Sequence, residues 1–178
     1  MTREPEAVPV PDDGTIPNNR LPFLVYRAVW SGDDGKPRGP EWFESRFAAN
    51  GWTASWRNGV YAYHHYHSNT HEVLGVYAGR AVVRVGGEAG FDAEIRAGDV
   101  VVIPAGGGHK RISSSRDFGV VGAYPDGASC DMRYGKPGER PSADRAIDAV
   151  ALPRTDPIYG DEGPLVRIWK DPPPRRST

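Results

Sequence analysis

The chain has 178 residues, of which 22 are Gly and 17 are Pro. Such frequent Gly and Pro exclude a coiled coil or another long-helix protein, and the excess of Val and Ile over Leu and Met favours a β-rich domain. The charges nearly balance, with 22 Lys and Arg against 23 Asp and Glu, so we expect no nucleic-acid partner. At this length one compact domain is expected.

The N-terminal sequence and the cysteine content bear on the cellular location. The first residues are acidic and rich in Pro, without the basic start and apolar stretch of a secretion signal. No apolar run approaches the ~20 residues that cross a bilayer, so we expect no membrane association. Cys130 is the single Cys and cannot form an internal disulfide, which suits a reducing compartment. The sequence therefore predicts a cytoplasmic protein.

In chain order, the first elements are an arm, a strand and a helix. Residues 1–19 have no apolar period and are predicted to form a flexible arm. Residues 21–29 are typical of a strand. A helix is predicted from Pro40 to Asn50, because Pro suits a first helical turn and the following Asn-Gly pair suits a C-terminal cap.

Residues 59–126 predict a barrel or sandwich, because short apolar runs recur there between Gly-rich breaks. The six or seven expected strands are VYAYHHYH, EVLGVYAG, AVVRVGG, FDAEIRAG, DVVVIPAG, HKRIS and FGVVGAYP. Beyond them we expect a short helix that Ser142 caps, a possible strand LVRIW and a flexible tail at 171–178. The predicted fold class is all-β, with a single domain at 20–170, a core barrel at 59–126 and one or two short flanking helices.

Four of the five histidines lie within eight residues, and their spacing indicates a metal site. His65 and His67 are two residues apart, so on a strand they project from the same face. Glu72 begins the next apolar run, and His109 follows a Gly-rich turn that can bring a third imidazole to the same cavity. Three neutral imidazoles and one carboxylate form a suitable ligand set for a divalent metal. The alternative is a polar barrel core that has such residues without binding a metal.

The same residues resemble the two sequence motifs of the cupin superfamily. The pattern Gly-x5-His-x-His-x4-Glu-x6-Gly occurs at Gly59, His65, His67, Glu72 and Gly79. The pattern Gly-x5-Pro-x-Gly-x2-His occurs at Gly98, Pro104, Gly106 and His109, with Ser113 where the second motif often ends in Asn. The resemblance implies a double-stranded β-helix, a jelly-roll barrel, that holds one divalent ion (Fe, Mn, Ni, Co or Zn) through His65, His67, Glu72 and His109.

Other polar residues near the motifs have weaker assignments. His71 and Tyr63 are candidates for proton transfer, although His71 could be a solvated turn residue and Tyr63 could fill the barrel. His64 points to the opposite side from its neighbours and is expected to be structural. Cys130 lies outside both motifs and is expected to be inert.

By resemblance to other cupins, we expect a metal-dependent enzyme that acts on a small polar or carbonyl-containing metabolite in the barrel. Dioxygenase-like oxidation and isomerisation are the two reactions implied. The alternative is a non-catalytic module that binds or senses a metal or small ligand. A homodimer is also expected, because the strand at 21–29 could pair along a sheet edge.

Overall fold

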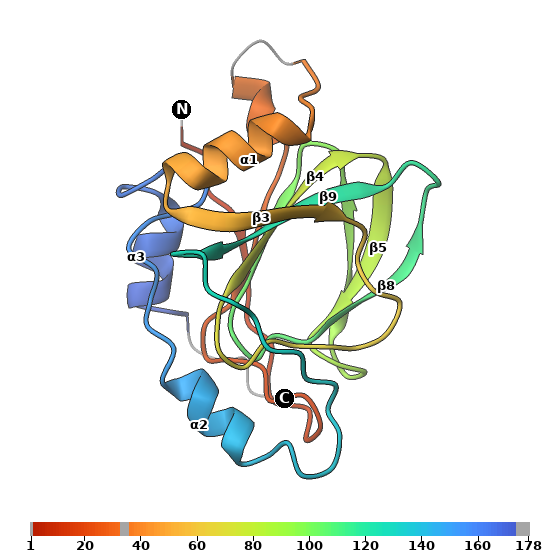
Figure 1. Cartoon of the computed structure of the whole chain (residues 1–178), viewed down its shortest axis with the longest axis vertical. Helices are drawn as coiled ribbons and strands as arrows, with labels where there is room; N and C mark the ends of the chain where they lie inside the picture. The colour runs from red at the N-terminus through yellow and green to blue at the C-terminus, as the bar shows by residue number, and fades with distance from the viewer. Residues whose placement is uncertain (1, 33–35, 174–178) are drawn as a thin grey trace.

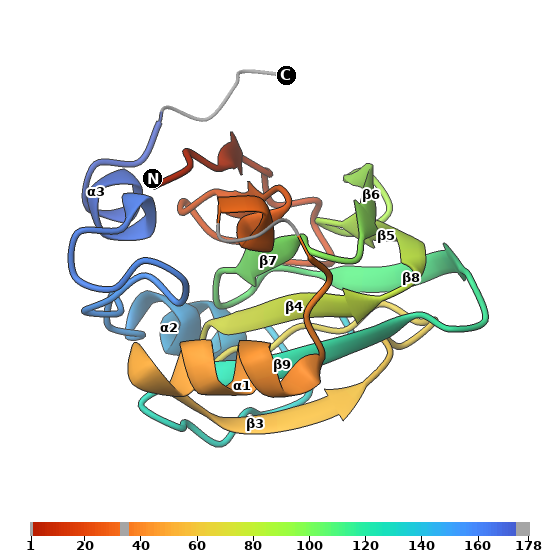
Figure 2. The same ribbon diagram turned by 90° about the horizontal axis from the view of Figure 1, so that it is seen from above.

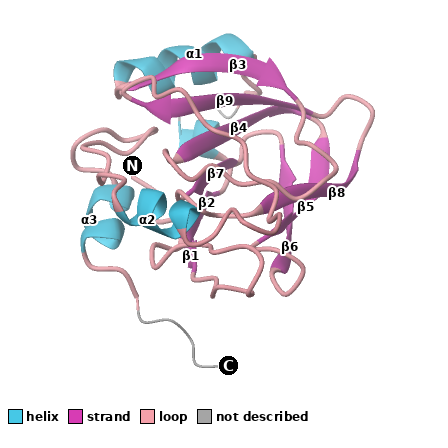
Figure 3. Ribbon diagram, turned by 60° about the horizontal axis from the view of Figure 1, so that its bottom comes forward, coloured by secondary structure: helices cyan, strands magenta, loops and turns pink. Residues whose placement is uncertain are grey.

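A computed structural model describes residues 2–32 and 36–173 (Figure 1). The strands in this part of the chain are β1 (Glu6–Val8), β2 (Phe23–Tyr26), β3 (Trp52–Asn58), β4 (Glu72–Ala78), β5 (Arg80–Val85), β6 (Phe91–Arg96), β7 (Val100–Ile103), β8 (His109–Ser114) and β9 (Gly119–Pro125). The helices are η1 (Val29–Gly32), a 3₁₀ turn, and the α-helices α1 (Pro40–Ala49), α2 (Ser142–Asp148) and α3 (Pro164–Lys170). Figure 3 shows the three α-helices outside the strands.

Two antiparallel sheets face each other and form the jelly-roll barrel that the sequence predicts. One sheet has the order β1-β2-β7-β4-β9-β3 and the other has the order β6-β5-β8 (Figures 1 and 2). A cluster of buried apolar side chains fills part of the space between them, with Leu74 and Val101 from the larger sheet and Val83 and Ile95 from the smaller one. These residues alternate with outward-facing neighbours, as strands that line a shared core require.

The outer face of the larger sheet is covered by helices, so this sheet is buried on both sides. Helix α1 lies against β3, β4 and β9 and buries Phe43 and Phe47 there. Gly75 of β4 allows this approach, because a Cβ atom at that position would lie 2.4 Å from a ring carbon of Phe43. Helix α3 adds Leu165 and Trp169 to the same cluster. The sheet that carries Glu72 is therefore held rigidly from outside the barrel.

Six of the seven expected barrel strands are confirmed, and the first is wrong. Residues 60–67 are mostly irregular and make only isolated bridges, from His65 to His109 and from Tyr66 to Arg133. Because neighbouring residues of this segment pair with different partners, no continuous ladder can form. The strand that precedes the segment is instead β3, which pairs with β9 at the edge of the larger sheet, so the sheets extend beyond the expected 59–126.

The predicted strand LVRIW is also wrong, because these residues form most of α3. Pro164 occupies the first helical turn, a position that its fixed φ favours. Leu165 and Trp169 are four residues apart and are buried on one face of the helix. The Asp156 carboxylate accepts hydrogen bonds from the backbone N–H groups of Ile158 and Leu165, and thereby fixes the start of the helix. The helices expected at 40–50 and after Ser142 are confirmed.

The N-terminal segment packs against the barrel, which differs from the expectation of a flexible arm at 1–19. Strand β1 pairs with β2, and Ile16 and Asn18 are buried. The Asn18 amide donates hydrogen bonds to the carbonyl groups of Pro11 and Gly86, and its oxygen accepts one from the backbone N–H of Gly108. A buried amide with this many partners stabilises the ordered segment. In the expected tail at 171–178, residues 174–178 lie outside the described part of the chain.

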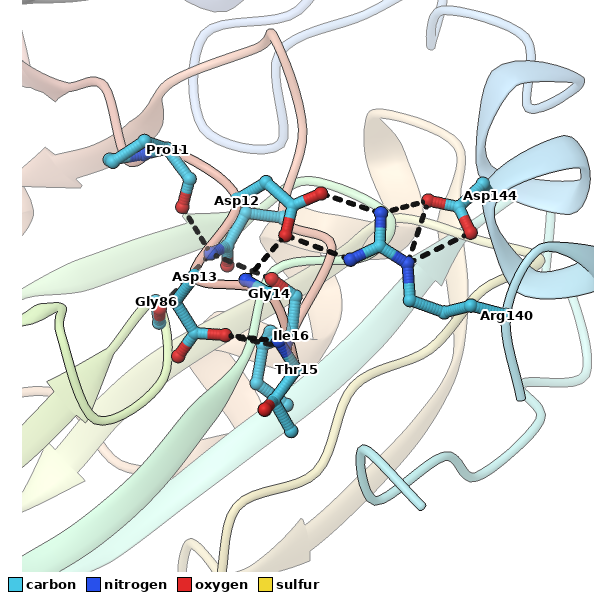
Figure 4. Close-up of polar contacts among 10 residues, drawn as sticks. Pro11, Asp12, Asp13, Gly14, Thr15, Ile16, Gly86, Arg140 and Asp144 are labelled. Atoms are coloured by element: carbon cyan, nitrogen blue, oxygen red, sulfur yellow. Dashed lines mark hydrogen bonds and ion pairs between the residues drawn. The ribbon is translucent and has the colours of Figure 1, made fainter. Parts of the chain in front are cut away.

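An ion-pair cluster joins this N-terminal segment to the region of α2 (Figure 4). The Arg140 guanidinium donates hydrogen bonds to the carboxylates of Asp12 and Asp144. The Asp13 carboxylate accepts hydrogen bonds from the backbone N–H groups of Thr15 and Ile16, which closes a local turn. The two contacts together hold a loop of the N-terminal segment beside the short helix.

Substitution of Gly75 by Ala tests the packing of α1 on the barrel. The added methyl group would overlap the Phe43 ring, so we expect the free energy of unfolding to fall by about 1–3 kcal/mol. Equilibrium unfolding in urea measures this change. Gly59→Ala is the matched control, because its nearest neighbour would be an ordinary 3.9 Å contact. Equal stability of the Gly75 variant and the wild type would contradict the described packing.

Candidate metal centre

Backbone pairing at the end of the barrel brings the two motifs together. His65 and His109 form an isolated antiparallel bridge, in which each backbone N–H donates to the carbonyl group of the other residue. The backbone N–H of Gly106 donates to the His67 carbonyl group at 2.7 Å. Glu72 begins β4, and the register of β4 on β7 places it opposite Ile103, just before the Gly-rich turn. Segments about 40 residues apart in the chain thus supply side chains to one cavity.

The four ligands that the cupin resemblance implies lie together in that cavity. Nitrogen atoms of His65, His67 and His109 are all within 4.8 Å of one another. Oε2 of Glu72 lies 3.3 Å from Nε2 of His67 and 3.3 Å from Nε2 of His109. None of the four residues is more than 4% exposed. Nitrogen and carboxylate donors at this spacing match the first coordination shell of a divalent cation.

Backbone carbonyl groups fix the orientation of each imidazole. Nδ1 of His65 lies 3.2 Å from the Tyr63 carbonyl oxygen, and Nδ1 of His109 lies 3.0 Å from that of Gly107. Nδ1 of His67 contacts the Asp131 carbonyl oxygen in the same way. Because a carbonyl group can only accept, each Nδ1 carries a proton and each ring presents its Nε2 atom to the cavity. Contacts of this kind orient the ligating histidines of metal sites.

The buried charge of Glu72 lacks a partner that suits it. Its Oε2 atom is buried and makes no hydrogen bond within the described part of the chain. Although burial favours the neutral carboxyl, the contacts with His109 and His67 outweigh it and hold the pKa of Glu72 below its usual range. An ionised carboxylate that is buried in this way is costly unless a cation neutralises it. The donor set therefore fits a bound metal ion.

The pKa values of two imidazoles move in opposite directions. Burial lowers the pKa of His65 to about 3, and the neighbouring His109 adds to this effect. Burial also opposes protonation of His67, but contacts with Cys130 and Glu72 outweigh it and raise the pKa of His67 to about 11. A proton on His67 is thus the alternative to a cation as the partner of Glu72. A metal ion that binds here must displace this proton.

The cavity beside the four residues has a volume of about 290 Å³. Its walls are largely apolar, with Trp56, Leu74 and Met132 among the lining side chains. Arg57 is the one Lys or Arg among the described lining residues, and it pairs with Glu41 and Glu44 of α1. A small molecule that enters the cavity therefore meets the ligand cluster on one side and an apolar wall on the other.

The structure does not bring His71 to the cavity. Its ring lies on the opposite side of β4 from Glu72 and packs on Trp169, with 4.7 Å between the ring centroids. Nδ1 accepts a hydrogen bond from the backbone N–H of Ala105, and Nε2 contacts the carbonyl oxygen of Ala151. Burial lowers the pKa of His71 to about 4, so the ring is neutral. Because both nitrogens have backbone partners, the ring joins α3 to the barrel and has no free atom for proton transfer.

Tyr63 and His64 lie outside the cavity as well. The Tyr63 side chain is 47% exposed and stacks on Tyr61, with its ring centroid 6.0 Å from that of His65. The alternation that suggested an inward Tyr63 requires a strand, and this segment is irregular. Its carbonyl group, rather than its hydroxyl, serves the site by orienting His65. His64 contacts Glu88 at 3.0 Å on the outside of the barrel, in agreement with the expected structural role.

The sequence did not indicate two further residues that line the cavity. Cys130 was expected to be inert, but its thiol lies at the cavity wall and contacts the hydroxyl of Tyr124. The contact with His67 lowers the pKa of this thiol. Tyr124 belongs to β9, and its ring lies 6.1 Å from that of His67. No sequence signal marks either residue, because both reach the site through contacts across the barrel.

Comparisons with known proteins agree with this architecture. The cupin domain family matches residues 55–117, which include all four candidate ligands. A protein of Bacillus subtilis (strain 168) described as uncharacterized protein YjlB is 48% identical over 170 residues, which cover 95% of this chain and 99% of that protein.

Similar solved structures cover smaller parts of the chain. An acireductone dioxygenase from Bacillus anthracis with a cadmium ion in its active centre is 19% identical over 53% of this chain and 63% of that one, with a TM-score of 0.39. A pumpkin seed globulin is 28% identical over 45% of this chain, with a TM-score of 0.38. The match spans 22% of the globulin.

Proton release tests the electrostatics of the four residues. The raised pKa of His67 keeps its imidazole protonated at pH 8, whereas an ordinary His with a pKa near 6.5 would be almost fully neutral. Binding of Zn(II) at pH 8 is therefore expected to release about one proton per ion, and the affinity should rise with pH up to about 11. Calorimetry in two buffers with different ionisation enthalpies measures the release. A value near zero would contradict the described pairing of His67 with Glu72.

Proposed function

The chain belongs to the cupin superfamily, and from this premise we propose that its barrel binds one divalent transition metal ion together with a small-molecule ligand. The metal ligands are His65, His67, Glu72 and His109. The observation that carries the proposal is that nitrogen atoms of three buried imidazoles lie within 4.8 Å of one another, beside a buried carboxylate oxygen that makes no hydrogen bond among the described residues. Fe, Mn, Ni, Co and Zn all accept this set of imidazole and carboxylate donors.

The activity proposed for this site is a reaction of a small metabolite that binds the metal through a carbonyl or another oxygen atom. A bound divalent ion with open positions would supply Lewis acidity and, if redox-active, dioxygen chemistry. The residues of the chain orient the metabolite, because its apolar part faces Trp56 and Leu74 while its oxygen end faces the ligand cluster. The four candidate ligands are buried at the inner side of this cavity. Dioxygenase-like oxidation and isomerisation are the two reactions proposed.

A specific observation favours a second function, a non-catalytic binding or sensing module. His71 has backbone partners at both nitrogens, and Tyr63 is exposed outside the cavity, so neither residue expected to transfer protons faces the bound molecule. A binding module needs no such group. The two functions differ in turnover, since ligand-dependent thermal stabilisation without a product indicates binding alone.

The assembly and location of the protein stay predictions. No helix in the described part of the chain is long and apolar enough to cross a membrane. The expected pairing of two copies through the strand at 21–29 is wrong, because β2 lies inside the sheet between β1 and β7. The larger sheet ends in β1 on one side and β3 on the other, and these are the edges at which a second copy would pair. We propose a homodimer that forms at one of these edges. The single Cys130, which suits a reducing compartment, supports the proposal of a cytoplasmic location.

Elemental analysis of protein purified without added metal, followed by a metabolite screen of the metal-loaded protein, tests the proposed function. We expect about one transition metal ion per chain. His65→Ala and His109→Ala should each lower the metal affinity by at least tenfold, since each removes one ligand. His64→Ala is the matched control, because its side chain lies outside the barrel, and it should retain the metal. Wild-type protein that never binds a metal stoichiometrically would overturn the proposal.

A further inference from the structure

Tyr124 is a polar residue in the cavity wall that is not part of the proposed ligand set. It lies on β9, is 7% exposed, and lines the same cavity as the four candidate ligands. Its hydroxyl is next to two other cavity residues, Trp56 and Cys130. This small group forms the wall on the His67 side of the cavity, with the Tyr124 and His67 rings 6.1 Å apart.

The partners of the Tyr124 oxygen determine where its proton points. The Trp56 indole N–H donates to this oxygen at 2.9 Å, and the Cys130 sulfur lies 3.3 Å from it. An indole nitrogen can only donate, so it occupies one lone pair of the phenolic oxygen, whereas a thiol can donate or accept. The hydroxyl proton is therefore directed away from Trp56, either to the Cys130 sulfur or into the cavity that Tyr124 lines. Because sulfur is a weak acceptor, an anionic oxygen of a bound molecule would take this proton in preference.

The net charge of the site with a metal ion bound indicates which kind of molecule binds in the cavity. Ligating imidazoles are neutral, so a divalent ion with the Glu72 carboxylate leaves one net positive charge. Glu72 is the one carboxylate among the described lining residues, and Arg57 is already paired with Glu41 and Glu44. A ligand with a single negative charge would neutralise the site. The apolar wall of Trp56, Leu74 and Met132 suits an uncharged body behind that group.

We propose that the Tyr124 hydroxyl donates a hydrogen bond to an anionic oxygen of a metal-bound ligand, and that this ligand is a monoanion with an apolar body, such as a carboxylate or an enolate. The proposal rests on the metal binding proposed above. Trp56 acts as a positioning residue, because its indole N–H occupies one lone pair of the hydroxyl oxygen and directs the hydroxyl proton away from the indole. The oxygen of the ligand thus binds between the metal ion and Tyr124, and its apolar body lies along the opposite wall.

The test uses the full chain loaded with Co(II), whose visible absorption changes when a ligand binds to the ion. Phenylacetate is the monoanionic probe, and phenylacetamide is a neutral molecule of the same shape. Tyr124→Phe should retain wild-type cobalt content but bind phenylacetate about tenfold more weakly or worse, because a hydrogen bond to a charged group is lost. Tyr61→Phe is the matched control, since this residue also lines the cavity and its hydroxyl has no assigned role. It should bind phenylacetate as the wild type does.

The possible results distinguish a failure of this inference from a failure of the proposed metal binding. Equal phenylacetate affinity in Tyr124→Phe and wild type would overturn the role of the hydroxyl. Tight phenylacetamide binding, or no phenylacetate binding by cobalt-loaded wild type, would overturn the monoanion. Wild type that takes up no cobalt would overturn the proposed function and this inference with it. If Tyr124→Phe does not fold, Trp56→Phe replaces it, with an expected loss of about threefold because the hydroxyl is no longer oriented; an unchanged affinity would overturn the proposal.

Discussion

The burial of the Glu72 carboxylate beside three imidazoles is the constraint on which the rest of the structure depends. A buried ionised carboxylate destabilises a protein by several kcal/mol unless a cation or several donors compensate it. Here the Oε2 atom of Glu72 makes no hydrogen bond among the described residues. The surrounding fold is arranged to hold this carboxylate in place, with helices on the outer face of its sheet and His109 on the facing strand.

The irregular parts of the chain contribute as much to this centre as the strands do. The carbonyl groups that orient the imidazoles belong to Tyr63, Gly107 and Asp131, and all three residues lie in loops. A regular strand at 60–67 that used the Tyr63 carbonyl group in a ladder would leave the His65 ring without its partner. The side chains of His71 and Asn18 in turn bind backbone groups of residues 105 and 108, so the Gly-rich turn before His109 is held from two sides.

The proximity of the four candidate ligands could be predicted from the sequence because the motifs that carry them are local. His65, His67 and Glu72 lie within eight residues, and the Gly and Pro positions around His109 recur at the spacing typical of cupins. The inward direction of Tyr63 was inferred from the alternation of side chains along a strand. This inference is wrong because residues 60–67 do not form a strand, and the Tyr63 side chain is exposed. The helix α3 was missed because Val and Ile favour strands, whereas its Pro164 and the burial of Trp169 favour a helix. Cys130 and Tyr124 meet the site only through tertiary contacts, which no pattern of neighbours encodes.

Anomalous diffraction from crystals of the zinc-loaded protein is the measurement that tests the metal centre most directly. The account predicts one strong peak inside the barrel, about 2.0–2.2 Å from Nε2 of His65, His67 and His109 and from an oxygen of Glu72. The Nδ1 atoms should remain bound to their carbonyl groups. A zinc ion held through Nδ1, through the Cys130 thiolate without Glu72, or only at the protein surface would contradict the account.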